Sequence, residues 1–191
     1  CNVLKVTMAA ILKETKDTVL EMLTVEVKEI STKMPIISAL GNKDLKPRHW
    51  KKIIELLKLQ WAPGKVWTLK ELLTTDIQNY KDEIEEISGV ASGQAQIENS
   101  IENIRKKWAE LAFVIQKYRD YKDRFIVGSV EDIVAALEEH QMNIQTMLGT
   151  RYVHEIRSLV EEWEKKLALI SEVIDEWLTC QRQWMYLENI F

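Results

Sequence analysis

Residues that interrupt helices are scarce in this sequence. It contains 6 glycines and 3 prolines among 191 residues, so the chain has few places to turn. A fold with many strands needs many turns, whereas long helices need few. This scarcity, together with abundant Leu, Ile, Glu and Lys, predicts a mainly α-helical protein and argues against a many-stranded sheet.

Cysteine, long apolar runs and an excess of one charge are lacking as well. The 2 cysteines, Cys1 and Cys180, share no motif spacing with each other or with a histidine, which favours a reducing compartment over a disulfide scaffold. No apolar run approaches the roughly 20 residues of a membrane span. The net charge of −4 gives no general attraction for nucleic acid or for an anionic membrane. We therefore expect neither as a partner.

The usual catalytic motifs are missing too. There is no phosphate-binding G-x-x-x-x-G-K-[ST] loop, no G-x-G-x-x-G, no G-x-S-x-G and no H-E-x-x-H. His49, His140 and His154 have no second histidine one helical turn away, so we interpret them as surface or capping residues rather than metal ligands. Cys180 lies between two tryptophans on a helix, where a buried and inert thiol is expected. The sequence thus predicts no catalytic, cofactor-binding or metal-binding residue.

Two segments in the first third of the chain, about 12–37 and 48–59, have strong helical periodicity. From about Leu12 to Lys33, and on to Ile37, apolar residues recur at steps of three and four, which predicts an amphipathic helix that kinks or restarts at Pro35. After a loop at 41–47, "RHWKKIIELLKL" resumes the helical spacing with Trp50 as its first anchor. A second loop, "WAPGKVW", follows at 61–67.

The middle of the chain predicts a long helix with a soft point. Thr68 and Glu71 have the spacing of a capping box, and an apolar stripe then runs from Tyr80 to Ile115. The stripe is interrupted at "SGVASGQ" (88–94), where Gly89 and Gly93 are the candidate hinge of the structure. The alternative, that these glycines only permit close packing of a neighbouring helix, is equally compatible with the pattern.

The last third of the chain predicts a hairpin and two helices. "FVIQKYRDYKDRFIVGS" (113–129) has aromatic and β-branched residues around a polar centre, as in a short β-hairpin. Ser129 and Asp132 predict a second capping box, and Gly149 a left-handed helix end. From Gly149 to Phe191 one apolar stripe continues without a break, which predicts a single helix of about 40 residues and roughly 60 Å.

Aromatic residues on these stripes are the expected structural anchors. The closing stretch "EWLTCQRQWMYLENIF" is interpreted as packing surface rather than as a ligand pocket. Its Gln181, Arg182 and Glu188 are expected to bond polar neighbours. The anchors are expected to be buried against other helices: Trp50, Trp108, Trp163, Trp177, Trp184 and Phe191.

One basic cluster stands out between 43 and 52. It holds Lys43, Lys46, Arg48, Lys51 and Lys52 around Trp50. Positive side chains in a first helical turn oppose the helix dipole. Arg48, Lys51 and Lys52 are therefore candidates for contact with an acidic partner, and a nucleic-acid role is the less favoured reading because the surrounding chain is neutral to acidic.

Several of these segments, taken in order, closely resemble the linker region of dynein heavy chains. The match extends from about Met34 to Phe191, and its end is more similar to axonemal than to cytoplasmic heavy chains. The segments that carry the resemblance are "LKPRHWKKI" (45–53), "WTLKELL" (67–73), "IENSIENIRKKWAEL" (97–111), "GSVEDIVAALEEHQMNIQTM" (128–147) and "WEKKLALISEVIDEWLTCQRQWMYLENIF" (163–191). The sequence departs from the family at 88–98, where Gly89, Gly93 and Gln94 replace alanines and a Lys-Glu pair.

The resemblance implies a mechanical element rather than an enzyme. In this family the linker lies across a hexameric AAA+ ring, joins the tail to the first AAA+ module, and bends as the ring binds and hydrolyses ATP. ATP and magnesium would belong to that ring, the microtubule would be contacted only indirectly, other dynein chains would bind through the tail, and the location would be the axoneme of a cilium or flagellum. The departure at 88–98 removes any ring contact made by the Lys-Glu pair.

These expectations combine into one description of the chain. It is a mainly α rod of helical bundles, cut from a longer polypeptide, with a long C-terminal helix and one short β-hairpin. Its parts are N-terminal helices at 1–60, a long helix plus the hairpin at 61–128, and C-terminal helices at 129–191. The alternative function is that of a spectrin-like scaffold or adaptor without a motor.

Overall fold

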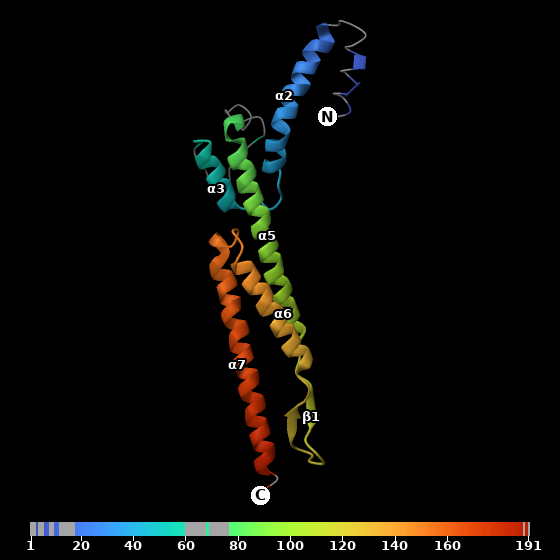
Figure 1. Ribbon diagram of the computed structural model, residues 1–191, viewed down its shortest axis with the longest axis vertical. Helices are drawn as coiled ribbons and strands as arrows, with labels where there is room; N and C mark the ends of the chain where they lie inside the picture. The colour runs from blue at the N-terminus through green and yellow to red at the C-terminus, as the bar shows by residue number, and fades with distance from the viewer. Residues whose placement is uncertain are drawn as a thin grey trace. The chain divides into compact units, whose positions relative to one another are not determined.

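The computed structural model describes residues 18–59 and 77–188, together with positions 3, 6, 7, 10, 11, 68 and 190. Five α-helices and one two-stranded antiparallel sheet occur in these ranges, which confirms a mainly α protein with one short hairpin. In chain order the elements are α2 (Thr18–Leu40), α3 (Pro47–Leu56), the 3-10 helix η1 (Ile77–Tyr80), α5 (Lys81–Glu110), β1 (Ile115–Lys117), β2 (Phe125–Val127), α6 (Glu131–Leu148), the 3-10 helix η2 (His154–Ile156) and α7 (Arg157–Glu188) (Figure 1). The loop expected at 61–67 and Glu71 of the first capping box lie outside the described residues.

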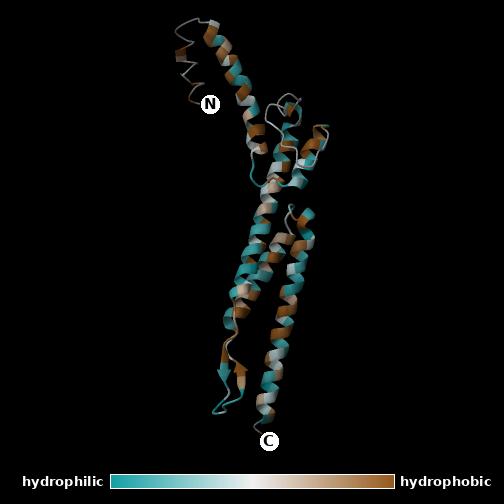
Figure 2. Ribbon diagram, turned by 180° about the vertical axis from the view of Figure 1, so that it is seen from behind, coloured by the Kyte–Doolittle hydropathy of each residue, from teal (hydrophilic) through white to brown (hydrophobic). Residues whose placement is uncertain are grey.

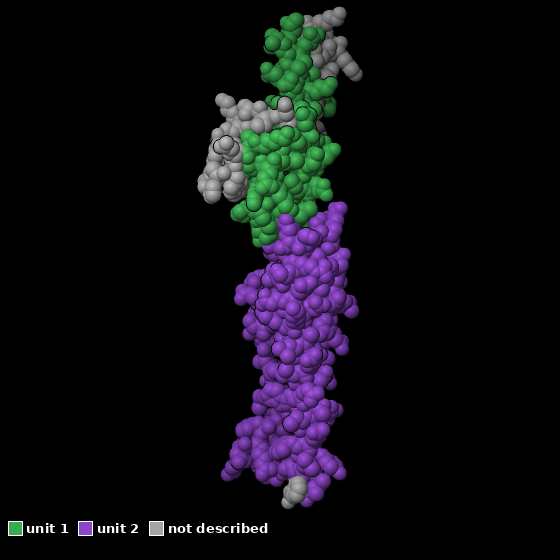
Figure 3. Space-filling view, turned by 90° about the vertical axis from the view of Figure 1, so that its left-hand side faces the viewer, with its two compact units in different colours: residues 1–93 green, residues 94–191 purple. Residues whose placement is uncertain are grey.

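The chain divides into two compact units, residues 1–93 and residues 94–191 (Figure 3). The boundary between them falls inside α5, directly after Gly93. The parts predicted from the sequence, 1–60, 61–128 and 129–191, are groups of successive elements rather than compact units. Their bounds stay a prediction.

The core of the first unit forms where α3 meets α2, η1 and α5. Trp50 is half-buried and packs against this core. Helix α3 begins at Pro47, a residue suited to the first turn because its missing N–H has no partner there in any case. The buried residues of the core are Ile36, Leu40, Ile53, Leu57, Ile77 and Ile84.

His49 closes the start of α3. Its side chain is only 1% exposed, and its Nδ1 accepts a hydrogen bond of 3.0 Å from the backbone N–H of Lys46. This bond satisfies one of the amide groups left without a partner at a helix start. The expectation that His49 has a capping role is therefore confirmed, although the residue is buried rather than on the surface.

Helix α2 differs from its expected form. It continues through Pro35 to Leu40, so the expected restart is wrong, whereas the expected kink stays a prediction. Burial of Ile36 and Leu40 in the core offsets the hydrogen bond lost at the proline. Its expected apolar stripe is largely exposed, with Ile30 at 52% and Met34 at 43%. The hydropathy colours of Figure 2 show apolar residues along the whole helix. Within the described residues, α2 thus buries its C-terminal end alone.

The second unit is a bundle in which residues 94–110 of α5, α6 and α7 share one core. The apolar stripes predicted for these helices face inward, as expected for amphipathic helices. Each fully buried Ile, Leu or Val stabilises the fold by about 1.5–3 kcal/mol relative to an exposed position. The buried residues of this core are Ile97, Ile101, Ile104, Leu137, Ile144, Met147, Val153, Ile156, Val160 and Leu167.

The hairpin predicted at 113–129 is confirmed. β1 and β2 pair with Ile115 opposite Val127 and Lys117 opposite Phe125. The connecting turn places Arg119 at a φ of 54°, in the left-handed region that residues other than glycine seldom adopt. The turn is closed by a hydrogen bond of 3.0 Å from the N–H of Tyr118 to the carbonyl of Arg124.

Both expected ends of α6 are corrected. The N-cap of α6 is Val130 without a side-chain cap, so the capping box of Ser129 and Asp132 is wrong. Ser129 Oγ instead accepts a long hydrogen bond of 3.4 Å from the N–H of Glu131. Gly149 does end α6, but with a right-handed φ of −77°, because the turn after it leads directly into η2.

The C-terminal helix is shorter than expected. Residues 149–156 form a turn and η2, so α7 begins at Arg157 and has 32 residues. At a rise of about 1.5 Å per residue this gives roughly 48 Å instead of 60 Å. The stripe still reads as continuous in the sequence because Val153 and Ile156 are buried in the same core before the helix begins.

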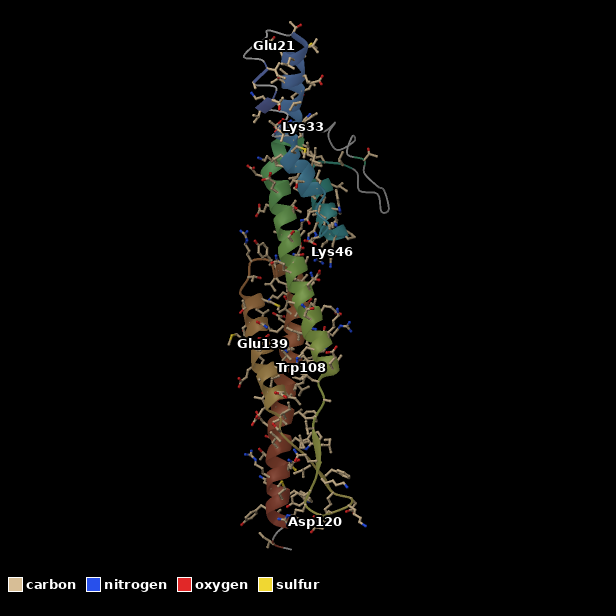
Figure 4. All side chains as sticks on the ribbon, turned by 90° about the vertical axis from the view of Figure 1, so that its right-hand side faces the viewer. Glu21, Lys33, Lys46, Trp108, Asp120 and Glu139 are labelled. Atoms are coloured by element: carbon tan, nitrogen blue, oxygen red, sulfur yellow. The ribbon has the colours of Figure 1, made fainter. Side chains whose placement is uncertain are left out.

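One polar contact joins α5 to α6 at the edge of the second core. The indole Nε1–H of Trp108, which is labelled in Figure 4, donates a hydrogen bond of 2.9 Å to Nδ1 of His140, which is 8% exposed. His140 therefore holds its own proton on Nε2. Burial lowers the pKa of His140, an effect that the nearby Glu139 carboxylate partly opposes and that Lys107 reinforces.

This contact predicts a pH dependence of stability. The pKa of His140 is lower in the folded than in the unfolded chain, so below about pH 6.5 the unfolded chain binds the extra proton first. We expect the free energy of unfolding to fall as the pH drops below 6.5 and to level off below the folded pKa. His140→Gln should flatten this part of the profile in denaturant titrations at pH 5 to 8. An unchanged slope in the variant would contradict the assignment.

Candidate functional site

The predicted aromatic anchors divide into two groups. Trp108 and Trp163 are half-buried and pack against the core of the second unit, and Trp50 packs likewise in the first. Trp177 and Trp184 are 51% and 39% exposed, so the expectation that they are buried is wrong for the described part of the chain. Phe191 lies outside it.

The exposure of Trp177 and Trp184 has a geometric cause. The buried seam of α7 continues from Ile174 to Gln181 and Glu188 in steps of seven, and these two tryptophans lie beside the seam rather than on it. Cys180 is exposed as well, which corrects the expectation of a buried thiol. Trp177 contacts Phe113 at a ring distance of 5.9 Å.

Polar side chains on the same seam fasten the β-hairpin to α7, and we call this set the hairpin clamp. It consists of Gln181 and Glu188 on the helix and Tyr118, Arg119, Tyr121, Arg124 and Val127 on the hairpin. Figure 1 shows β1 and β2 beside the C-terminal half of α7. The clamp takes over where the apolar seam of α7 ends.

Gln181 forms the first half of the clamp. Its Oε1 accepts a hydrogen bond of 2.8 Å from the N–H of Val127, and its Nε2 donates one of 2.9 Å to the Val127 carbonyl. The amide side chain thus pairs with both backbone groups of one strand residue, as a neighbouring strand would. Val127 is 5% exposed, so these two groups would otherwise be buried without a partner in the described structure.

Glu188 forms the second half of the clamp. One carboxylate oxygen accepts hydrogen bonds from Tyr121 Oη at 2.7 Å and from Arg124 at 2.8 Å. The other oxygen accepts longer ones from Arg119 at 3.3 Å and from Tyr118 Oη at 3.4 Å. The side chain of Glu188 is 12% exposed, whereas the two arginines are 49% and 41% exposed. One carboxylate therefore gathers four donors from the hairpin turn.

Stacked rings support these donors from the side. The rings of Tyr118 and Tyr121 lie nearly parallel at 6.2 Å, and Tyr118 also meets Trp184 at 5.0 Å. The guanidinium of Arg124 lies 4.0 Å from the centre of the Tyr121 ring. Such contacts each add roughly 0.5–1 kcal/mol at exposed sites. The rings fix the directions of the hydroxyl and guanidinium groups that reach Glu188.

The clamp shifts two pKa values. Hydrogen bonding from Tyr121, followed by the positive charges of Arg119 and Arg124, lowers the pKa of Glu188 despite an opposing effect of burial. The same bond raises the pKa of Tyr121, since the carboxylate disfavours a second negative charge beside it. The clamp is therefore complete over the range in which Glu188 is ionised and Tyr121 is not.

The sequence predicted only those residues of the hairpin clamp that lie on α7. Gln181 and Glu188 were expected, together with Arg182, to bond polar neighbours that were not identified. The partners of Glu188 lie in and beside "RDYKD" (119–123), which was predicted only as the polar centre of a hairpin. A signal was present, since two arginines and two tyrosines in one short turn are more donors than a turn needs.

The candidate partner-contact residues lie on α3. Lys51 and Lys52 are exposed and Arg48 is half-buried, as the basic cluster predicts for its surface. Lys51 approaches Glu55 at 3.9 Å, a long exposed pair that contributes little. The nature of the partner stays a prediction.

The candidate hinge residues differ in their surroundings. Both glycines lie inside α5, which continues through 88–94. Gly89 is exposed, and a Cβ placed there would meet no atom within 4 Å, so close packing does not account for it. Gly93 is buried. Asn42 donates hydrogen bonds to Ser88 and Ser92 at 2.9–3.0 Å, which ties the preceding loop to this segment.

Neither a metal-binding cluster nor a helix able to cross a membrane is found in the described ranges. Within them, no group of three or more His, Cys, Asp or Glu side chains is placed to hold a metal ion. Among the same residues, no helix is both long and apolar enough to span a membrane.

The charge of Glu188 is expected to control the hairpin. Glu188→Gln keeps the size of the side chain but removes the charge that attracts both arginines, so amide hydrogen exchange over 113–128 should become faster at pH 7. Because the folded pKa of Glu188 is lowered, the charge contributes stability above the ordinary glutamate value of 4.5, and this contribution is lost as the pH falls through the folded pKa. Glu176→Gln, on an exposed position of α7, is the matched control. Equal exchange in both variants would contradict the clamp.

Gln181 allows a second prediction that does not involve charge. Gln181→Leu leaves the N–H and C=O of Val127 without their partners and should lower the free energy of unfolding by about 1–3 kcal/mol. Gln183→Leu, exposed on the same helix, should change it by less than about 0.5 kcal/mol. Denaturant titration compares the two. If Gln181→Leu lowers the free energy of unfolding no more than Gln183→Leu does, the two hydrogen bonds of Gln181 to Val127 do not stabilise the fold.

The chain matches one family along nearly its whole length. The family model described as dynein heavy chain, N-terminal region 2, covers residues 2–191. Human dynein axonemal heavy chain 6 is 37% identical over 176 residues, and human dynein axonemal heavy chain 10 is 33% identical over 171 residues. The dynein-1-alpha heavy chain of the flagellar inner arm I1 complex of Chlamydomonas reinhardtii is 32% identical over 176 residues.

These matches cover most of this chain and little of the relatives. They span 92%, 88% and 91% of this chain, respectively, but only 4% of each relative. The matched family model covers far more than half of the chain. The chain therefore belongs to the dynein heavy chain family, within its N-terminal region 2.

Proposed function

We propose that this chain is a mechanical linker segment of a dynein motor. It would transmit the conformational change of an ATP-driven AAA+ ring to the tail, and so drive movement along a microtubule. The observation that carries the proposal is the family match over residues 2–191. The matched residues make up only 4% of human dynein axonemal heavy chain 6, so the ring and the tail would lie elsewhere in a much longer heavy chain.

The hairpin clamp gives this role a physical basis. A segment that transmits displacement must resist deformation along its length. α7 supplies 32 residues of continuous helix, and the hairpin is fastened to it at Gln181 and again at Glu188. Two attachment points prevent the hairpin from pivoting about one of them.

A soft point is also needed, and the glycines of α5 are the candidate. Gly89 lowers helix stability by roughly 0.5–1 kcal/mol relative to alanine and fills no packing role. The boundary between the two compact units directly follows Gly93. Both observations favour local bending at 88–94, with Asn42 as a tether that limits it.

The surroundings of the segment follow from the same proposal. The similar proteins are named as axonemal or flagellar dyneins, which supports a place in the axoneme of a cilium or flagellum. The partners would be the AAA+ ring of the same polypeptide and, through the tail, other dynein chains. Arg48, Lys51 and Lys52 would serve contact with an acidic surface. ATP and Mg²⁺ would bind in the ring, and this segment would perform no catalysis of its own.

The proposal is tested in the full-length heavy chain with Gly89→Ala. The added methyl group fits in open space, so it should stiffen the helix without disturbing its neighbours. We expect slower microtubule gliding with basal ATP hydrolysis retained. Asn99→Ala, at an exposed position of the same helix, raises helix propensity away from the glycines and should leave gliding unchanged.

Other outcomes of this experiment are equally informative. Normal gliding in Gly89→Ala would place the bending point elsewhere. Loss of both gliding and ATP hydrolysis would indicate a folding or ring defect instead of a mechanical one. A spectrin-like scaffold, the alternative function, predicts that gliding does not depend on this segment, and replacing Glu188 and Gln181 together by alanine would then have no effect on velocity.

A further inference from the structure

Helix α2 carries an apolar seam that is half-buried at Leu20, Val27 and Ile37 and exposed at its other three residues. From Leu20 to Ile37 the seam alternates steps of three and four without a slip, which is the a and d pattern of a coiled coil. Leu23, Ile30 and Met34 of this set are 44%, 52% and 43% exposed. The full seam consists of Leu20, Leu23, Val27, Ile30, Met34 and Ile37.

The core of the first unit does not use this seam. α2 enters that core through Ile36 and Leu40. At about 100° per residue, Ile36 projects from the opposite side of the helix to Val27. The seam therefore remains available while the C-terminal end of the helix is packed.

Two opposite charges flank the seam on the same edge. Glu26 and Lys33 are seven residues apart and each lies directly before a seam residue, Val27 and Met34, in the position known as g. Neither side chain forms an ion pair with another described residue. The other edge carries only Thr24, Ser31 and Ser38. Glu26 and Lys33 therefore have no oppositely charged partner along this edge of α2.

We propose that α2 pairs with the α2 helix of a second copy of this chain as an antiparallel two-stranded coiled coil. When two such helices run in opposite directions with full overlap, Val27 faces Ile30 of the second copy, Leu20 faces Ile37 and Met34 faces Leu23. Every seam layer is then apolar. In the same register Glu26 lies beside Lys33 of the second copy, and two-fold symmetry repeats the pair.

The charges select this direction over the parallel one. In a parallel pair a g position meets the following e position, so Glu26 would face Ser31 and Lys33 would face Ser38, without any ion pair. In the antiparallel pair g positions face each other, which gives two Glu–Lys pairs per dimer. The seam is short, so the association is weak and depends on protein concentration.

Charge reversal tests the pairing in the 191-residue chain. Sedimentation equilibrium at low salt should detect a dimer. Lys33→Glu converts both ion pairs into repulsions and should raise the dimer Kd by roughly tenfold or more. Glu26→Lys should do the same, whereas the double variant Glu26→Lys/Lys33→Glu restores both pairs and should recover the original Kd. Figure 4 labels Lys33 on α2.

A matched control is Lys28→Glu, which makes the same charge change on the side of α2 away from the seam and should leave the Kd unchanged. A chain that stays monomeric at all concentrations would overturn the proposal, as would a dimer whose Kd is the same in all charge variants. An equal weakening by Lys28→Glu would show that only net charge matters, which also contradicts specific pairing.

The relative direction of the two α2 helices is measured independently with nitroxide labels on cysteines that replace Glu21 or Glu29, one at a time. In the antiparallel register equal positions are separated along the axis by roughly 22 Å at residue 21 and roughly 2 Å at residue 29, at 1.5 Å per residue. Label distances that differ accordingly support the pairing. Equal distances at the two positions would indicate a parallel dimer and overturn it.

Discussion

The seam of α7 is the constraint on which the second unit depends. Val160 and Leu167 lie on it seven residues apart and bury apolar surface against α5 and α6. Ile174 follows at the same interval and is buried beside Phe113 and Val127. Gln181 and Glu188 continue the same interval where those helices no longer supply an apolar surface. The helix thus keeps one face inward along its length while the chemistry of that face changes from apolar packing to directed hydrogen bonds. A polar group on a seam is stable only if its partners are fixed, and the hairpin supplies them.

This change of chemistry explains why the fold was easier to predict than the site. Stripes of Ile, Leu and Val identified α5, α6 and most of α7, because burial of amphipathic helices leaves a regular pattern in sequence. The pattern could not decide between neighbouring faces of α7. Apolar residues occupy both 177 and 184, which are exposed, and 178 and 185, which are half-buried. Trp177 and Trp184 lie three residues after Ile174 and Gln181, about 60° around the helix from the buried face, so a stripe drawn through the tryptophans runs beside that face.

Other misjudged features share a different cause, which is competition between local signals. Ser129 has the spacing of a capping residue, yet the helix begins one residue later, after the chain has completed the ladder bond from Gly128 to Val114. Pro35 is a strong local interruption, yet packing of Ile36 and Leu40 outweighs it. The exposure of α2 was not predictable at all from its own sequence, since an amphipathic pattern shows that a face can be covered and does not identify the element that covers it.

The two halves of the hairpin clamp respond differently to dissolved salt. The bonds of Glu188 to Arg119 and Arg124 join charges on side chains that are 49% and 41% exposed, where mobile ions screen their attraction. The bonds of Gln181 to the backbone of Val127 are part-buried and involve no charge, so salt has little to screen there. As ionic strength rises, the turn of the hairpin loosens while its base stays attached to the helix. The stiffness of this segment is therefore graded along the hairpin, and the ionic composition of the surrounding fluid sets how much of it is rigid.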